Sequence, residues 1–252
     1  MNIEPYRQIL IKYWGFTSFR PLQEEVIKSV AEGRDTLGLM PTGGGKSMTF
    51  QIPAIAAEGI CLVITPLIAL MKEQVARLNS LEIKSLAIHS GMSQEEIDIV
   101  LENSIYGDYK FLYISPERIS SSLFQARVQK MNLNLIAVDE AHCISQWGYD
   151  FRPSYLKIAL LRDIVSEKVP FLALSASATT QVADDIMNKL QFRQKNVLRT
   201  SFERKNISYF VRNVEDKGSF LIKTLNKTKG SGIVYVRSRK RSKEIAELLV
   251  AN

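Results

Sequence analysis

The sequence predicts an α/β fold in which a mostly parallel sheet is covered by helices on both faces. Short apolar runs alternate with longer segments of helical pattern, and the runs are continuously apolar. A strand that is buried on both faces has this pattern, because both of its sides contact apolar side chains. In addition, a glycine-rich segment and an acidic segment each follow one of the runs, which is where ligand sites lie in open α/β sheets.

Segments with apolar residues three and four positions apart are predicted as helices. In chain order these are Glu4 to Trp14, Leu22 to Glu32, Ser47 to Ala57, Ala69 to Ser80, Ser93 to Tyr106, Tyr155 to Val165 and Thr180 to Leu190. The apolar runs are predicted as strands, at Thr36 to Met40, Cys61 to Thr65, Ser85 to His89, Phe111 to Ser115, Leu135 to Val138 and Phe171 to Ser175. Ser93 and Glu96 have the spacing of a capping box.

Length and composition predict a globular chain of one or two domains. It has 252 residues, of which 46% are hydrophobic and 23% charged, and no apolar stretch approaches the roughly 18 residues that span a membrane. The N-terminus lacks the apolar block of a signal peptide, so a cytoplasmic location without a membrane partner is expected. Cys61 and Cys143 are too few for a zinc site and are expected to stay as thiols. The formal net charge of +7 favours a polyanionic partner.

The segment MPTGGGKS, Met40 to Ser47, has the residues of a phosphate-binding loop. Its glycines allow positive φ angles and a close approach of the backbone to phosphates, and the following helix adds partial positive charge. Lys46 is expected to reach the β- and γ-phosphates, and the Ser47 hydroxyl to coordinate Mg²⁺. The strict pattern has glycine where this chain has Met40. The alternative is a glycine-rich turn that only connects a strand to a helix.

Two adjacent carboxylates, Asp139 and Glu140, follow the apolar run Leu133 to Val138. Their mutual repulsion costs stability unless a cation is bound there. Asp139 is therefore expected to hold Mg²⁺, and Glu140 to orient or deprotonate the attacking water. Taken alone, the segment is also compatible with an ordinary solvated acidic turn. Together with the phosphate loop it predicts an ATPase, whose catalytic residues are Lys46, Asp139 and Glu140.

The segment CISQWGYDFRPSY, Cys143 to Tyr155, combines rings with the basic residue Arg152. It lacks helical or strand periodicity and is predicted as a loop. Its aromatic residues are Trp147, Tyr149, Phe151 and Tyr155. Single-stranded nucleic acid is bound by cations that contact phosphates and by rings that stack on bases, so the loop is expected to make ATP turnover depend on DNA. The alternative is that the rings only cover the edge of the sheet.

Five segments resemble, in this order, the motifs of the RecQ family of superfamily 2 DNA helicases: MPTGGGKS, TPLIALMKEQV, SPER, AVDEAHCISQWGYDFRPSY and GIVYVRSRKRS. The resemblance covers nearly the whole chain, and the aromatic extension after DEAH is its most distinctive part. It implies a RecA-like P-loop NTPase domain, the beginning of a second one, and a 3′-to-5′ motor. Such a motor couples Mg·ATP hydrolysis to translocation on single-stranded DNA and to duplex unwinding in DNA repair and recombination. The implied partners are single-stranded and partly duplex DNA and a single-strand-binding protein, with a nucleoid-associated location in a bacterium.

The resemblance also implies which residues bind the nucleotide. In GFTSFRPLQ, Gln23 would hydrogen-bond the adenine edge, with Phe16 and Arg20 at its faces. The alternative places Phe16 and Phe19 in the core and Arg20 on the surface as a charge. The implied nucleotide-binding residues are Phe16, Arg20, Gln23, Thr42, Gly43, Gly44, Gly45, Lys46 and Ser47.

A second group of residues is implied to contact DNA or to link it to the ATP site. TPLIALMKEQV and SPER resemble the family's motifs that contact the DNA backbone. In ALSASATT, the hydroxyls of Ser175 and Ser177 stand where the family has threonines; a turn that caps the next helix is the alternative. The residues implied to couple nucleic acid to ATP are His142, Gln146, Trp147, Phe151, Arg152, Ser175 and Ser177.

The chain is expected to change domain near Ser201. Residues 1–201 are predicted as the ATP-binding RecA-like domain 1, and 202–252 as the N-terminal part of domain 2, with SFERKN as a polar linker. A helix from Lys217 to Asn226, a strand over GIVYV and a helix from Arg239 to Val250 are expected there. About 50 residues do not bury a full RecA-like core, so this part is expected to be docked on the first domain, completed by a partner copy, or poorly ordered.

The resemblance implies that the second domain supplies an arginine worth about 10³ to 10⁵ in rate, and the sequence does not identify that arginine. Zinc is expected only in a C-terminal region of the family. The chain is therefore expected to bind Mg·ATP, to hydrolyse it slowly and not to unwind duplex. A non-catalytic nucleotide- and single-strand-binding module and an RNA helicase remain as alternatives, since the phosphate loop and DEAH do not distinguish between the two sugars.

Overall fold

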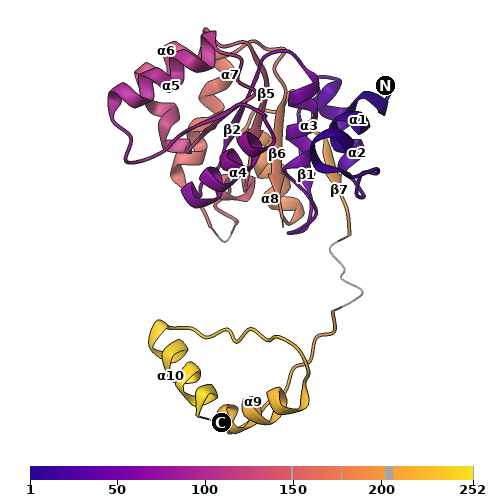
Figure 1. Ribbon diagram of the computed structural model, residues 1–252, viewed down its shortest axis with the longest axis vertical. Helices are drawn as coiled ribbons and strands as arrows, with labels where there is room; N and C mark the ends of the chain where they lie inside the picture. The colour runs from indigo at the N-terminus through magenta and orange to yellow at the C-terminus, as the bar shows by residue number, and fades with distance from the viewer. Residues whose placement is uncertain (149, 177, 202–206, 252) are drawn as a thin grey trace. The chain divides into compact units, whose positions relative to one another are not determined.

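The computed structural model describes all residues except 149, 177, 202–206 and 252. It divides into two compact units, Met1–Phe202 and Glu203–Asn252. The first unit contains a seven-stranded parallel sheet in the order β3-β4-β2-β5-β6-β1-β7 (Figure 1). The predicted α/β fold is confirmed.

All six predicted strands form, because each is an apolar run that can be buried on both faces. The strands are β1 Thr36–Leu39, β2 Ile60–Ile64, β3 Ser85–Ile88, β4 Phe111–Ile114, β5 Leu133–Val138, β6 Phe171–Ser175 and β7 Val197–Arg199. Strand β7 was not predicted. It has three residues at the edge of the sheet and pairs only with β1 among the described strands, so it needs no apolar run.

The predicted helices of the first unit also form, with one correction. The helices are α1 Glu4–Trp14, α2 Gln23–Ala31, α3 Met48–Ala56, α4 Ile68–Ser80, α5 Gln94–Tyr106, α6 Ser122–Val128, α7 Leu161–Ile164 and α8 Thr180–Lys189, with 3-10 helices η1 Pro116–Ser120, η2 Ala141–Ile144 and η3 Pro153–Leu160. The predicted single helix Tyr155 to Val165 is wrong, because η3 covers most of it and only its last turn, α7, is α-helical. Among the described residues, none of the helices has the length and apolar character needed to cross a membrane.

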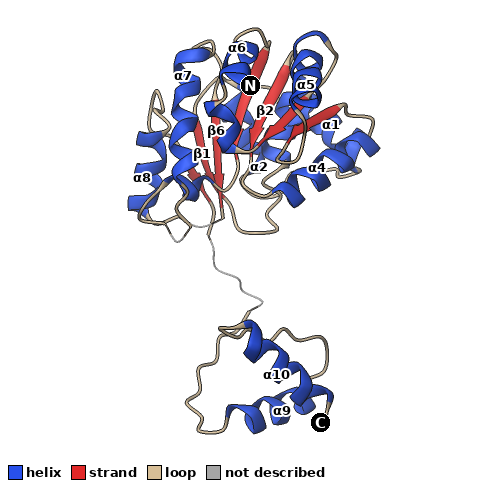
Figure 2. Ribbon diagram, turned by 90° about the vertical axis from the view of Figure 1, so that its left-hand side faces the viewer, coloured by secondary structure: helices blue, strands red, loops and turns tan. Residues whose placement is uncertain are grey.

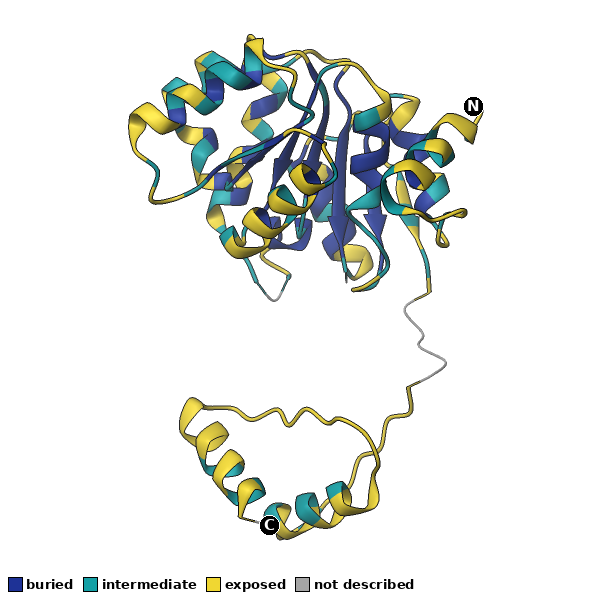
Figure 3. Ribbon diagram, in the orientation of Figure 1, coloured by how far each residue is buried: buried dark blue, intermediate teal, exposed yellow. Residues whose placement is uncertain are grey.

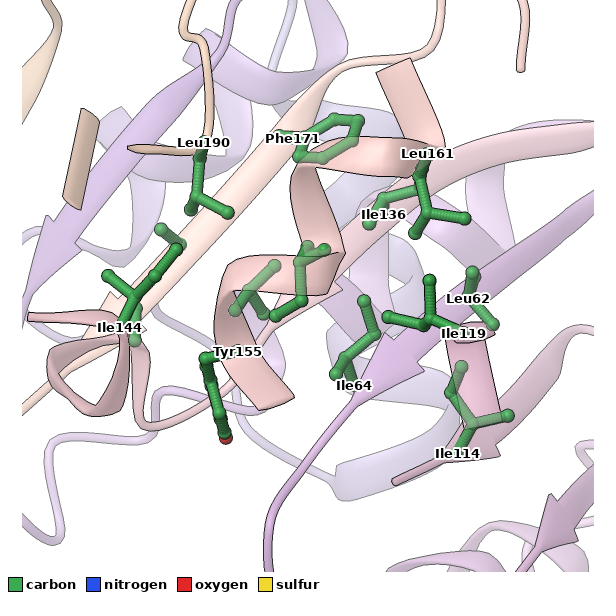
Figure 4. Close-up of a cluster of buried hydrophobic side chains, with 14 of the residues drawn as sticks. Leu62, Ile64, Ile114, Ile119, Ile136, Ile144, Tyr155, Leu161, Phe171 and Leu190 are labelled. Atoms are coloured by element: carbon green, nitrogen blue, oxygen red, sulfur yellow. The ribbon is translucent and has the colours of Figure 1, made fainter. Parts of the chain in front are cut away.

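Helices cover both faces of the sheet (Figure 2). One apolar core lies between the sheet and α5, α6, η3, α7 and α8; it includes Leu62, Ile136 and Phe171 (Figure 4). The other core lies between the sheet and α2, α3 and α4, and α1 packs on α2 and α3 around Leu10 and Ile27. Apolar side chains therefore cover most of both faces of the sheet.

A buried ion cluster joins three segments at the amino-terminal edge of the sheet. Asp35 is fully buried, accepts hydrogen bonds from the backbone of Phe171 and from Arg193, and lies 2.9 Å from the guanidinium of Arg162. Burial by itself raises the pKa of Asp35, but these hydrogen bonds and charges outweigh it and lower the pKa. The cluster ties the start of β1 to α7 and to the chain before β7.

We expect Asp35→Ala to lower the free energy of unfolding by about 3–5 kcal/mol, because it leaves Arg162 buried without its counter-charge. Asp184→Ala is the matched control, since its pair with Lys195 is solvent-exposed and contributes about 0–1 kcal/mol. Urea unfolding followed by circular dichroism measures both. Equal effects of the two substitutions would contradict a stabilising role of the cluster.

The second unit contains two helices, α9 Lys217–Lys227 and α10 Arg239–Val250, which begin at the N-caps Asp216 and Ser238. The predicted strand GIVYV is wrong: residues 232–236 have no regular secondary structure. A strand needs a neighbour to accept its backbone hydrogen bonds, and no strand is described in this unit. The described side chains of the second unit are mostly exposed (Figure 3). Of the predicted linker SFERKN, residues 202–206 lie outside the described part of the chain.

Candidate nucleotide site

The carboxyl ends of β5, β6 and β1 lie side by side, because these strands are parallel and adjacent in the sheet. The glycine-rich loop follows β1, the acidic pair follows β5, and β6 ends at Ser175 between them. The glycine-rich loop, the acidic pair and the end of β6 are far apart in the sequence, and they thus meet at the carboxyl ends of the central strands.

The glycine-rich loop has a conformation that other residues would not tolerate. Gly43 and Gly45 have φ angles of 78° and 77°, in the left-handed region that favours glycine. A Cβ on Gly44 would lie 2.8 Å from the carbonyl oxygen of Pro41. Three consecutive glycines are therefore needed for the bend that leads into α3, and Ser47 is the N-cap of that helix.

The side chain of Gln23 holds this loop. Its Nε2 donates to the carbonyl of Gly45 at 3.0 Å, and its Oε1 accepts from the backbone N–H of Arg20 at 2.8 Å. The Arg20 guanidinium donates to the carbonyl of Gly43. Both polar atoms of the Gln23 amide are thus engaged with protein, and its predicted contact with adenine stays a prediction.

The two aromatic residues of the GFTSFRPLQ segment differ in burial. Phe16 is 50% exposed, so the alternative that it is a core residue is wrong. Phe19 is partly buried and packs against the α1–α3 core, as that alternative expected. Phe16 is therefore free to take the predicted place beside an adenine ring.

The acidic pair faces the lysine of the loop. Lys46 Nζ lies 3.8 Å from Glu140 Oε1, and the backbone N–H of Glu140 donates to Asp139 Oδ1 at 3.0 Å. Glu140 has φ 47° and ψ 45°, a left-handed conformation that is uncommon for a residue with a side chain. The chain turns sharply here, directly after β5, and both carboxylates stay at the edge of the sheet.

Burial determines the electrostatics of the pair. It raises the pKa of Asp139 to about 6, the negative charge of Glu140 adds to this rise, and Lys46 opposes it. A buried carboxylate beside a second one is stabilised by a cation. The donor set therefore fits a divalent cation, and hard oxygen ligands such as a carboxylate and the Ser47 hydroxyl suit Mg²⁺.

His142 connects the acidic pair to β6. Its ring is 3% exposed, and Nδ1 lies 3.3 Å from Glu140 Oε2 and 3.1 Å from Ser175 Oγ. Burial lowers the pKa of His142 against the opposing effect of Glu140, which favours the neutral ring. The predicted coupling residues His142 and Ser175 are thus in contact, whereas Ser177 lies outside the described residues.

The aromatic loop contains both exposed and structural side chains. Gln146 is exposed and Trp147 is 69% exposed. Tyr155, in contrast, is fully buried, and its hydroxyl donates to the carbonyl of Asp139 at 2.9 Å. The alternative that the rings only cover the sheet is correct for Tyr155 (Figure 4) and does not apply to Trp147. Tyr149 lies outside the described residues.

Two further contacts hold the loop in place. Arg152 donates to Asp150 through Nε and Nη2 at 3.2 and 3.0 Å, and its Nη1 lies 3.5 Å from the carbonyl of Pro66, just before α4. The ammonium group of Lys189 lies 5.9 Å from the Phe151 ring and donates to the carbonyl of Ile144. Sequence reasoning missed Lys189, whose position four residues after Asp185 predicts only a surface ion pair on a helix.

A parallel sheet with a glycine-rich loop after β1 and an acidic pair after β5 defines the P-loop class of nucleotide-binding domains. The chain belongs to the DEAD/DEAH box helicase family, whose model matches residues 20–186. It is 43% identical over 98% of its length to the ATP-dependent DNA helicase RecQ of Bacillus subtilis, and 39% identical to the probable ATP-dependent DNA helicase RecS of the same organism. The predicted resemblance to RecQ helicases is confirmed.

The chain spans less than half the length of these two relatives, 42% of the first and 49% of the second. Solved structures support the fold. The DUF1998 helicase MrfA superposes with a TM-score of 0.71 at 18% identity, over 98% of this chain and 40% of the other. A hypothetical ATP-dependent RNA helicase from Sulfolobus tokodaii superposes with a TM-score of 0.61 at 20% identity, over 98% of this chain and 72% of the other. At these identities the likeness concerns the fold alone.

Proposed function

We propose that this chain is the ATP-binding part of a RecQ-type, 3′-to-5′ ATP-dependent DNA helicase, with residues 1–201 as its first RecA-like domain and 202–252 as the beginning of the second. The observation that carries the proposal is the 3.8 Å approach of Lys46 to Glu140. It supports these roles, because the glycine-rich loop then lies opposite the carboxylate that is proposed to act on water. The identity to RecQ proteins supports DNA as the partner.

In this proposal, the chain's residues have separate roles. The loop from Thr42 to Ser47 binds the triphosphate, and Lys46 neutralises its terminal phosphates. Glu140 orients the attacking water and accepts its proton, and its hydrogen-bonding distance to His142 allows that ring to hold the carboxylate in place. Asp139 and Ser47 would hold Mg²⁺, which supplies charge neutralisation on the phosphate oxygens.

DNA is proposed to bind along the same edge of the sheet. Trp147 is exposed and lies five residues after His142, and Arg152 is near the carbonyl of Pro66 at the start of α4. A base stacked on Trp147 would therefore contact a loop that continues directly from the acidic pair. Base stacking on an aromatic ring contributes about 1–3 kcal/mol, enough to bias the conformation of such a loop.

The function is tested by nucleotide binding and ATP hydrolysis with and without an oligonucleotide. We expect a fluorescent ATP analogue to bind in the presence of Mg²⁺, and single-stranded DNA to raise the rate of hydrolysis. Equal stimulation by a matched RNA strand would favour the RNA-helicase alternative. If this chain binds nucleotide and DNA without hydrolysing ATP, and a longer chain of the relatives' length behaves in the same way, the non-catalytic module is favoured.

We expect Trp147→Ala to leave hydrolysis without DNA within about twofold and to weaken single-stranded DNA binding by roughly 5- to 150-fold, the equivalent of one lost stacking contact. Stimulation of hydrolysis by DNA should fall with it. Tyr106→Ala on α5 is the matched control, because Tyr106 is also an exposed ring, 76% accessible. Fluorescence anisotropy with a labelled oligonucleotide measures binding. A loss of DNA-free and DNA-stimulated hydrolysis in the same proportion would indicate that Trp147 only packs.

A further inference from the structure

Three polar side chains cross the apolar core between the sheet and helices α3 and α4. Gln51 Nε2, on α3, donates to the hydroxyl of Tyr113 at 3.4 Å, and that hydroxyl donates to Gln74 Oε1, on α4, at 3.0 Å. Tyr113 lies on β4 and is fully buried, Gln51 is 6% exposed, and Gln74 is half-buried. The three residues form a continuous hydrogen-bonded chain from one helix to the other.

This hydrogen-bonded network of three side chains has a cost in free energy, because it lies in an apolar core. The Tyr113 ring packs in a core of apolar side chains that includes Phe50, Val63 and Met71. Phenylalanine would fill the same space without a hydroxyl to satisfy, and buried polar groups stabilise a core only when all of them are paired. Burial raises the pKa of Tyr113, so the hydroxyl stays protonated and acts as a donor. Packing alone therefore does not explain why this hydrogen-bonded network lies in the core.

The hydrogen-bonded network joins α3 and α4. Helix α3 begins at the proposed nucleotide site and α4 at the proposed DNA site. Gln51 lies in the first turn of α3, where its backbone N–H donates to the carbonyl of Ser47 in the phosphate loop at 3.0 Å. Helix α4 begins just after Pro66, in the segment TPLIALMKEQV. Met71 and Leu78 are the buried residues of its 13, and Val75 packs against the same core. The bond from Tyr113 to Gln74 adds a polar contact between α4 and the sheet.

We propose that Gln51, Tyr113 and Gln74 are positioning residues that transmit nucleotide binding at the phosphate loop to helix α4. The inference rests on the proposed function for the nucleotide and DNA sites. It adds a route through the core on one face of the sheet, which does not pass through the acidic pair or the aromatic loop. A movement of the first turn of α3 changes the Gln51–Tyr113 bond and, through the shared hydroxyl, the hold on α4.

The test is amide hydrogen exchange of α4 with and without a non-hydrolysable ATP analogue and Mg²⁺, on the whole chain. In the wild-type chain we expect the nucleotide to change exchange in α4 by at least about fivefold, the lower end of ordinary coupling energies. The decisive variant is Gln51→Met/Tyr113→Phe/Gln74→Met. It replaces all three polar groups by apolar groups of similar shape, which leaves no buried group unpaired and is nearly neutral for stability.

We expect this triple variant to bind the nucleotide within about twofold of wild type and to unfold at a similar urea concentration, while α4 no longer responds. The single variant Tyr113→Phe should also lose the response and be less stable, because two amides stay unpaired. Ser104→Ala is the control: it removes a buried hydroxyl that donates to the carbonyl of Val100 in its own helix α5, and it should keep the response. Reciprocally, the effect of the nucleotide on affinity for an oligo-dT strand should fall in the triple variant.

A triple variant in which α4 still responds to the nucleotide overturns the inference, as does a wild-type chain that binds the nucleotide without any change in α4. A wild-type chain that does not bind Mg·ATP contradicts the proposed function, and the inference with it. Nucleotide binding thus separates a failure of the inference from a failure of the function on which it rests.

Discussion

Lys46→Ala is expected to weaken Mg·ATP binding by about 10²-fold or more. A charge-assisted hydrogen bond contributes about 1.5–3 kcal/mol, and Lys46 is predicted to contact two phosphates; about 1.4 kcal/mol corresponds to tenfold in affinity. No other residue of the segment Met40 to Ser47 is a cation, and the nearby Arg20 guanidinium is engaged with the carbonyl of Gly43. Titration of a fluorescent ATP analogue measures the effect.

The control for this substitution is Lys130→Ala, which removes an exposed lysine in the turn after α6 and should leave the affinity unchanged. Circular dichroism of both variants shows whether the fold is intact. The Lys46 side chain is 15% exposed, and its ammonium group lies 3.8 Å from Glu140 Oε1. An Lys46→Ala chain with wild-type affinity would refute the placement of the triphosphate.

Glu140→Gln is expected to keep Mg·ATP binding within about threefold and to lower the rate of hydrolysis by about 10² to 10⁴, the usual contribution of a general base. The amide has the shape of the carboxylate and stays near His142, but it does not accept a proton from water. Asp139 and Lys46 are unchanged, so the groups that bind the phosphates and Mg²⁺ remain.

Single-turnover hydrolysis with the protein in excess over ATP measures this rate even when turnover is slow. Glu95→Gln, at an exposed position in the first turn of α5, is the matched control and should be neutral. If Glu140→Gln reduces binding as much as hydrolysis, Glu140 acts by holding the nucleotide, and its assignment to the water is incorrect.

The class of fold was predictable because strands and helices leave local patterns in the sequence. Continuous apolar runs correctly predicted β1 to β6, and the capping box of Ser93 and Glu96 correctly predicted the start of α5. The errors arose where local pattern is weak. In the segment from Pro153 to Ile164, the same apolar spacing is compatible with a 3-10 helix and an α-helix, and GIVYV has the composition of a strand but no neighbour to pair with in its unit.

By itself, the sequence determined the α/β class, the order of most elements, the glycine-rich loop after β1 and the acidic pair after β5, because each depends on residues that are close along the chain. Only the tertiary structure decided which of these meet. The order β5-β6-β1 brings Lys46 to Glu140 and His142 to Ser175. The packing of helices and loops on the sheet buries Tyr155 while Trp147 stays exposed, and it aligns Gln51 and Gln74 with Tyr113 of β4. The physical reason is that strand order and the packing of helices on the sheet are set by the combined burial of many distant side chains, which no local pattern records.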